Sequence, residues 1–151
     1  IENMLKERKI NKKEHLLAIK SAIASTSHSD LIKKRYDKLL DVKTGKVPMI
    51  VESKITQINT KQIIESVKNI LGDLSIVGKK EKSVRAGKGK SRNRKYKQSK
   101  GVLIVTGNKE QLKTKLYDNK KVNELEIKDL YPLGRLTIYT ENAIKDLEEF
   151  K

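Results

Sequence analysis

Residues 102–106 read Val-Leu-Ile-Val-Thr, and they form the strongest strand pattern in this chain of 151 residues. Five consecutive residues of high β-propensity predict a strand that is buried on both of its faces. Such strands are typical of parallel sheets, in which helices cover both sides. The segments around this strand should therefore supply further parallel strands and the helices that cover them.

Strand-like and helix-like patterns alternate on either side of that strand. Residues 47–51 and 135–139 are short runs with branched apolar residues and predict strands, and Pro48 marks a strand start or an edge. Residues 61–71 carry apolar side chains at helical spacing. Thr140 is placed to cap a last helix. Its inward-facing residues are predicted to be Ala143, Ile144, Leu147 and Phe150. This order predicts an α/β fold with three layers, α/β/α, around a mainly parallel sheet.

Other patterns suggest the remaining elements. Asn11 and Glu14 have the spacing of a capping box, with the third helical amide donating to Asn11, and a helix is expected to follow over residues 12–25. A second helix is expected over residues 29–39, and Thr60 is expected to cap the helix after it. Further predictions are a strand at 74–77, a helix at 108–115, a strand at 122–127 and a helical turn at 127–131.

The composition changes abruptly between residues 79 and 100. This stretch holds eleven Lys or Arg and one Glu, and so carries ten of the sixteen net positive charges of the chain. Only Val84 could join a core. We therefore predict a long basic loop at residues 78–101, within a single domain that spans residues 1–151.

The residue types in this loop suit contacts with RNA. Gly87 and Gly89 alternate with lysines, and glycine lets the backbone approach a phosphate closely. Arg92 and Arg94 can pair with phosphates or stack on exposed bases, and Tyr96 can stack on a base or a ribose. A run of charge is also typical of a solvated or disordered segment or of a nuclear targeting patch. Composition alone therefore predicts only a contact with a polyanion.

The overall composition further limits the classes of molecule that this chain could bind. A net charge of +16 repels itself unless an anionic partner supplies counter-charge. Nucleic acid is favoured over a membrane, because the sequence has no lipidation signal, no amphipathic helix with bulky anchors and no apolar run near the roughly 20 residues needed to cross a bilayer. The chain has no cysteine, which excludes disulfides, thiolate metal sites and thiol nucleophiles.

Nucleotide and metal motifs are not complete in this chain. The dinucleotide fingerprint fails because Arg92 stands where a third glycine is needed, and the P-loop pattern fails at Val84. His15 and His28 are isolated and do not suggest a metal site. We expect no metal, no cofactor and no small-molecule substrate.

One alternative class stays open, a basic α/β enzyme that processes nucleic acids. Such an enzyme needs acidic metal ligands gathered at strand ends. Glu52, Asp73 and Asp118 are candidates, but they are scattered along the sequence without a supporting motif.

Residues 83–96 read Ser-Val-Arg-Ala-Gly-Lys-Gly-Lys-Ser-Arg-Asn-Arg-Lys-Tyr. This segment resembles the signature of the universal L-four family of large-subunit ribosomal proteins in its archaeal and eukaryotic form, Arg-Ala-Gly-Lys-Gly-Lys-Met-Arg-Asn-Arg. Only Ser91 departs from that pattern. Residues 10–24, 101–105 and 134–143 resemble further segments of the family in the same order, so the likeness covers residues 10–151.

The resemblance implies a structural constituent of the large ribosomal subunit with no catalytic role. It implies binding to large-subunit ribosomal RNA, contact with neighbouring ribosomal proteins, support of subunit assembly and a cytoplasmic location in the ribosome. The residues it places against RNA are Arg85, Gly87, Lys88, Gly89, Lys90, Arg92, Asn93, Arg94, Lys95, Tyr96, Lys97 and Lys100, with Lys12 and Lys13 near it.

The family also has an N-terminal portion, with a first strand and a Gly/Arg-rich extension that reaches the nascent-chain tunnel. This sequence is expected to begin after that portion. No residue here is therefore assigned to the tunnel, and it stays open whether the sheet is complete within these residues.

Overall fold

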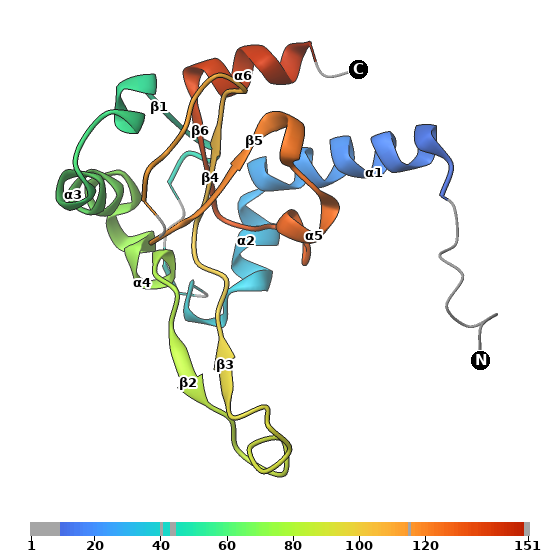
Figure 1. Cartoon of the computed structure of the whole chain (residues 1–151), viewed down its shortest axis with the longest axis vertical. Helices are drawn as coiled ribbons and strands as arrows, with labels where there is room; N and C mark the ends of the chain where they lie inside the picture. Colours follow the sequence, from blue (N-terminus) through green and yellow to red (C-terminus); the bar gives the residue numbers. More distant parts are fainter. Residues whose placement is uncertain (1–9, 40, 43–44, 115, 150–151) are drawn as a thin grey trace.

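The computed structural model describes residues 10–39, 41–42, 45–114 and 116–149. Its centre is a four-stranded sheet of order β1-β6-β4-β5, in which all neighbouring strands are parallel (Figure 1). The strands span Met49–Val51 (β1), Leu103–Thr106 (β4), Asp118–Lys121 (β5) and Thr137–Thr140 (β6). The predicted strand at 102–106 is thus confirmed, and it pairs with a strand on each side.

Strand β4 is buried on both faces. All four of its residues are buried, and their side chains alternate between two core clusters. Ile104 belongs to one cluster, and Leu103 and Val105 belong to the other. In β6, Ile138 belongs to the same cluster as Ile104, and Tyr139 belongs to the other cluster. The alternation follows from strand geometry, in which successive side chains point to opposite faces.

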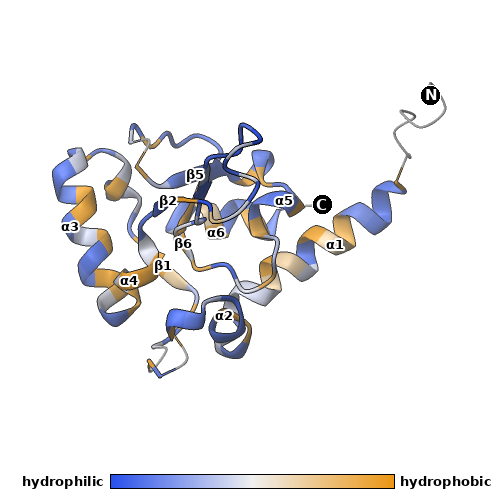
Figure 2. Cartoon of the chain, turned by 90° about the horizontal axis from the view of Figure 1, so that it is seen from below, coloured by the Kyte–Doolittle hydropathy of each residue, from blue (hydrophilic) through white to orange (hydrophobic). Residues whose placement is uncertain are grey.

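Helices cover both faces of the sheet. They span Lys12–Ala24 (α1), Ser29–Arg35 (α2), Thr60–Leu71 (α3), Ser75–Gly78 (α4), Ile127–Leu130 (α5) and Glu141–Glu148 (α6). Helix α3 packs Ile63 and Val67 into one cluster, whereas α1, α5 and α6 contribute Ala22, Leu130 and Ala143 to the other. Figure 2 shows α3 and α4 on one side of the strands and α1 and α5 on the opposite side. The predicted α/β/α layering is therefore confirmed.

Short 3₁₀ turns connect these elements. They span Ser25–Ser27, Asp37–Leu39, Ser53–Thr56, Gly72–Leu74 and Val122–Glu124. The helix expected over residues 29–39 is split, because α2 ends at Arg35 and a 3₁₀ turn follows Tyr36. The Tyr36 hydroxyl accepts a hydrogen bond from the Leu136 amide at 3.4 Å, which ties this break to the start of β6.

The helix caps differ in detail from the predictions. The Asn11 side chain accepts from the Lys13 amide at 3.0 Å, one residue before the amide expected from the capping box. Asn59, rather than Thr60, is the residue before α3. The Thr140 hydroxyl accepts from the Ala143 amide at 3.2 Å, so the last helix begins as predicted. Phe150, expected to face inward from that helix, lies outside the described residues.

Two predicted elements are wrong. Residues 74–77 were expected to form a strand, but they lie in a 3₁₀ turn and α4. A helical turn lets Leu74 and Val77 contact the same core cluster, which an extended strand would not allow. Residues 108–114 of the predicted 108–115 helix are not helical. The Asn108 amide instead donates to Asp146 of α6 at 2.6 Å, and its side chain accepts from the Asn123 amide at 3.1 Å.

Two further segments differ from their predicted form. The strand expected at 122–127 lies four residues earlier, as β5, and Val122 begins a 3₁₀ turn. Val122 and Leu125 are the apolar residues that suggested this strand. In the structure they instead fill the core beneath the 3₁₀ turn. The basic segment at 79–100 is not a plain loop, because it contains the antiparallel strands β2 (Lys82–Val84) and β3 (Tyr96–Gln98). In the part of the chain described here, no helix is long and apolar enough to span a bilayer.

Candidate nucleic-acid interface

The basic segment forms a hairpin that projects from the body of the molecule (Figure 1). Strands β2 and β3 pair in antiparallel register, with Ser83 opposite Lys97 and Val84 opposite Tyr96. Every residue of both strands is exposed, in contrast to the four buried residues of β4. The hairpin continues into β4 through residues 99–102, so it leaves the sheet at the amino end of that strand.

The tip of the hairpin is closed by backbone hydrogen bonds. The Arg85 amide donates to the Lys95 carbonyl at 2.8 Å, and the Arg94 amide donates to the Gly89 carbonyl at 3.0 Å. Gly87 and Asn93 have φ angles of 80° and 59°, in the left-handed region that glycine and asparagine tolerate best. Asn93, predicted as a contact to RNA, therefore also shapes the turn.

The two glycines of the motif differ in whether their backbone conformation requires glycine. Gly87 needs its conformational freedom because of its positive φ angle. At Gly89, a Cβ atom would lie 3.6 Å from the Arg85 side chain, an ordinary contact, and the backbone is not left-handed. The fold alone therefore requires glycine at position 87 but not at position 89.

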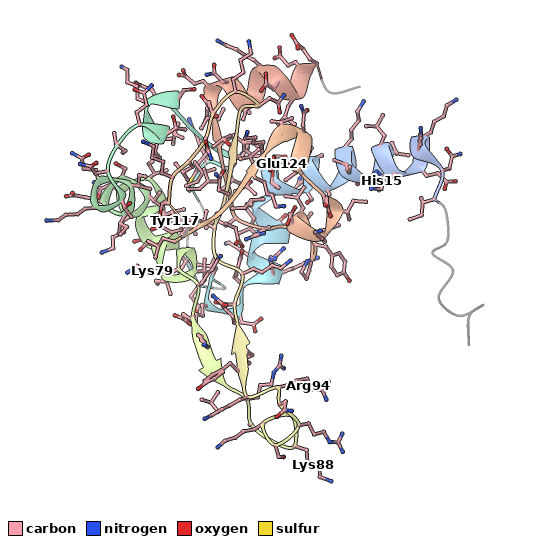
Figure 3. All side chains as sticks on the ribbon, viewed as in Figure 1. His15, Lys79, Lys88, Arg94, Tyr117 and Glu124 are labelled. Atoms are coloured by element: carbon pink, nitrogen blue, oxygen red, sulfur yellow. The ribbon has the colours of Figure 1, made fainter. Side chains whose placement is uncertain are left out.

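Most of the predicted contact residues lie together on this hairpin. They are Arg85, Gly87, Lys88, Gly89, Lys90, Arg92, Asn93, Arg94, Lys95, Tyr96 and Lys97. In Figure 3, Lys88 and Arg94 lie at the far end of the hairpin, whereas Lys79 lies where it joins the body. The stretch from Lys82 to Gln98 has eight basic residues and no acidic one. The positive charge is thus concentrated on the part of the molecule farthest from the core.

Tyr96 is held between two lysines on the hairpin surface. The Lys82 ammonium lies 4.2 Å from the centre of its ring, and the Lys95 ammonium lies 5.6 Å from it. Such a cation over an aromatic face is attracted to the ring. About half of the Tyr96 surface is exposed (49%), so the ring remains accessible to a partner. Lys82 was not among the predicted residues, because only the strand register brings it next to Tyr96.

Lys100 lies at the root of the hairpin, where its ammonium donates to the Lys128 carbonyl at 2.7 Å. Its charge is therefore directed toward the body. Lys12 and Lys13 are exposed at the first turn of α1, and this end of the helix points away from the hairpin (Figure 1). The structure does not bring these two lysines together with the hairpin tip.

A network of charged residues at the hairpin root was not predicted. Asp118, at the start of β5, accepts from Arg135 and forms an ion pair with Lys80 at 2.5 Å. Arg135 is buried, with 1% of its surface exposed, and also donates to the carbonyls of Gly101 and Asp129. No local sequence pattern predicts this network, because Lys80, Asp118 and Arg135 lie in three segments that are distant in the sequence and meet only in the folded chain.

The acidic residues required by the enzyme alternative do not gather. Asp118 is engaged at the hairpin root, Asp73 lies in the turn after α3, and Glu52 pairs with Lys54 at 3.3 Å after β1. Across the described ranges, no three His, Cys, Asp or Glu residues are grouped so that they could hold a metal ion.

The fold and the hairpin together define a class: a parallel α/β domain that carries an exposed basic β-hairpin. A family model described as "Ribosomal protein L4/L1 family" matches residues 6–150. The chain therefore belongs to the ribosomal protein L4/L1 family.

Curated relatives support the same family. The chain is 42% identical over 151 residues to "Large ribosomal subunit protein uL4" of Methanococcoides burtonii, covering 93% of this chain and 58% of that protein. It is 33% identical over 155 residues to the protein of the same name from Methanosphaera stadtmanae, covering 96% and 59%. The Thermoplasma acidophilum protein is 42% identical, covering 93% and 58%. The chain thus spans just under 60% of the length of these relatives.

Proposed function

We propose that this chain is a structural, non-catalytic constituent of the large ribosomal subunit, which binds large-subunit ribosomal RNA through its basic hairpin. The proposal includes support of subunit assembly, contact with neighbouring ribosomal proteins and a cytoplasmic location in the ribosome. It needs no metal, cofactor, membrane or small-molecule substrate. Family membership and the names of the relatives support the ribosomal part of the proposal.

The observation that carries the RNA contact is the exposed hairpin with eight basic and no acidic residues. A rigid body that concentrates its charge on one projecting ribbon can enter a groove of folded RNA and release counterions from its phosphates. The unfilled space at Gly89 supports close approach of a phosphate to the backbone, because the fold itself accepts a side chain there. Tyr96 adds an accessible ring for stacking.

Replacement of both Arg92 and Arg94 by Ala tests this proposal. If the hairpin neutralises about six phosphates, log affinity for large-subunit RNA should fall with log salt at a slope of roughly −5. The double variant should bind more weakly, and its slope should be shallower by about one unit for each lost phosphate contact. Fluorescence anisotropy with a labelled RNA transcript, measured over a salt series, gives both quantities.

The matched control is the pair Lys61→Ala and Lys68→Ala, which removes two exposed charges from α3. It should leave affinity and slope close to those of the wild-type chain. Equal losses in both double variants would show a generic effect of net charge and would contradict a hairpin interface. Magnesium-dependent cleavage of the RNA by the purified chain would overturn the structural role in favour of the enzyme alternative.

A further inference from the structure

The two ends of the hairpin meet at the body in direct backbone contact. The Val102 amide donates to the Gly78 carbonyl at 3.0 Å. A Cβ atom on Gly101 would lie 2.4 Å from that same carbonyl oxygen, so only glycine fits there. The incoming segment at Gly78 and the outgoing segment at Gly101 therefore lie side by side where the hairpin begins.

Asp118 is linked to both of these segments. One carboxylate oxygen pairs with the Lys80 ammonium at 2.5 Å, on the incoming segment. The other accepts from the Arg135 guanidinium, which in turn donates to the Gly101 carbonyl at 3.2 and 3.3 Å on the outgoing segment. A third guanidinium nitrogen donates to the Asp129 carbonyl at 2.6 Å. The network thus joins the two ends of the hairpin to β5 and to the residues before β6.

The charges of this network depend on one another. Arg135 is almost fully buried, and a buried guanidinium needs both a counter-charge and acceptors for its hydrogen bonds. Burial by itself raises the pKa of Asp118, but hydrogen bonds from Lys80 and Arg135 outweigh it and hold that pKa below its ordinary value. Asp118 is therefore the ionised centre of the network at neutral pH.

The other side-chain contacts that hold the root lie on the surface. Glu81 pairs with Lys38 at 2.8 Å, but both side chains are more than half exposed, and such pairs contribute little. The contact of Lys100 with the Lys128 carbonyl is exposed as well. A two-stranded ribbon has no core of its own to fix its direction. The partly buried network is thus the firmest side-chain attachment among those described at the root.

We infer that Asp118 is a positioning residue: together with Lys80 and Arg135 it fixes the direction of the basic hairpin relative to the sheet without contacting RNA itself. The inference rests on the proposed function, because the hairpin must first be the RNA-binding element. A hairpin held in one direction loses less conformational freedom on binding, so its affinity is higher. RNA affinity therefore depends on a carboxylate, although a carboxylate repels phosphate.

Asp118→Asn separates positioning from simple electrostatics. The variant has one more net positive charge, so electrostatics alone predicts tighter binding to RNA. Loss of the positioning network predicts weaker binding, by roughly five- to tenfold, which corresponds to about 1 kcal/mol or slightly more. The salt slope should stay at its wild-type value, because no phosphate contact is lost. A shallower slope would instead place the network at the RNA surface and overturn the inference.

Lys80→Met provides a second variant if the first folds poorly, since it leaves the pair between Asp118 and Arg135 in place. Its control is Lys54→Met, which removes the same charge from an exposed side chain after the carboxyl end of β1, at the opposite end of the sheet from the hairpin root. Lys80→Met should weaken binding at an unchanged salt slope, whereas Lys54→Met should behave as the wild-type chain does.

The direction of the hairpin can be measured without RNA. Because the chain has no cysteine, Ser91→Cys at the tip and Glu148→Cys on α6 allow a single pair of spin labels. Double electron–electron resonance should give one narrow distance distribution for the labelled wild type and Lys54→Met. It should give a broader one for Asp118→Asn and Lys80→Met. Wild-type width or undiminished affinity in both network variants overturns the inference, while a persistent loss in the Arg92 and Arg94 variant shows that the proposed function still holds.

Discussion

At the scale of single residues, Glu110 fills the place where many α/β proteins bind ligands. It lies just beyond β4, at the carboxyl ends of the parallel strands, which is the usual binding edge of such sheets. Its carboxylate accepts from the Thr140 hydroxyl at 2.7 Å, the Gly107 amide at 3.0 Å and the Asn142 side chain at 2.7 Å. The polar groups at the carboxyl ends of the strands are thus hydrogen-bonded to one another. The charged hairpin leaves the sheet at the opposite edge, at the amino end of β4.

This arrangement makes stability depend on pH through Glu110. Burial raises the pKa of Glu110, but the hydrogen bonds that its carboxylate accepts have a larger, opposite effect. The pKa therefore lies below its ordinary value. A carboxylate with a lowered folded-state pKa stabilises the fold above its unfolded pKa of about 4.3, and that stabilisation is lost as the pH falls through the folded value. Chemical denaturation should therefore show that the free energy of unfolding of the wild-type chain falls between pH 6 and pH 3. The fall should be smaller for the Glu110→Gln variant.

The control for that measurement is Glu65→Gln, which changes an exposed carboxylate of α3. It should keep the pH dependence of the wild-type chain. An equal change in both variants would mean that the acid response reflects total charge and not the hydrogen bonds to Glu110.

At the scale of elements, strands β4 and β5 form by different means. Residues 103–106 of β4 are Leu, Ile, Val and Thr, which favour a strand by themselves. Residues 118–121 of β5 are Asp, Asn, Lys and Lys, and only pairing with β4 makes them a strand. The first strand was therefore predictable from local sequence, and the second was not.

Beyond its root, the hairpin is exposed along both of its strands and packs on no core. A single pair of short strands without a core is marginally stable in water. Amides of β2 and β3 should exchange with deuterium roughly a thousandfold faster than amides of β4, whose opening requires much of the sheet to come apart. Addition of large-subunit RNA should slow exchange in the hairpin, because a bound ribbon opens less often. Hydrogen exchange with mass spectrometry tests both expectations, and equal protection of β2 and β4 in the free chain would contradict them.

At the scale of the whole molecule, charge and core are separated in space. Ten of the sixteen net positive charges lie between residues 79 and 100, and the two core clusters lie on the faces of the sheet. The separation allows a chain that is 36% charged to keep a packed core, because the repelling residues are placed outside it.

Salt should therefore act in opposite directions on folding and on binding. Raising the ionic strength from 10 to 150 mM shortens the Debye length from about 30 to about 8 Å and screens the repulsion between basic residues. The melting temperature of the free chain should rise by roughly 3 °C, while its affinity for RNA should fall. Calorimetry should show a smaller rise for a variant with Lys88, Lys90, Lys95 and Lys97 changed to Gln. A melting temperature that falls with salt would contradict this.

The sequence by itself determined the central strand predicted at 102–106, the helices predicted at 12–25 and 61–71, the last strand and helix, and the family motif at residues 83–96. These follow from patterns within a few neighbouring residues, such as side-chain periodicity, caps and turn-forming glycines. Only the tertiary structure decided that Asp118 begins a strand, that residues 74–77 are helical and that the basic segment is a hairpin held by Lys80, Asp118 and Arg135. The physical reason is that these conformations depend on partners that are distant in the sequence, such as Arg135 and Lys80, which lie 17 and 38 residues from Asp118. Local propensity contains no information about such contacts.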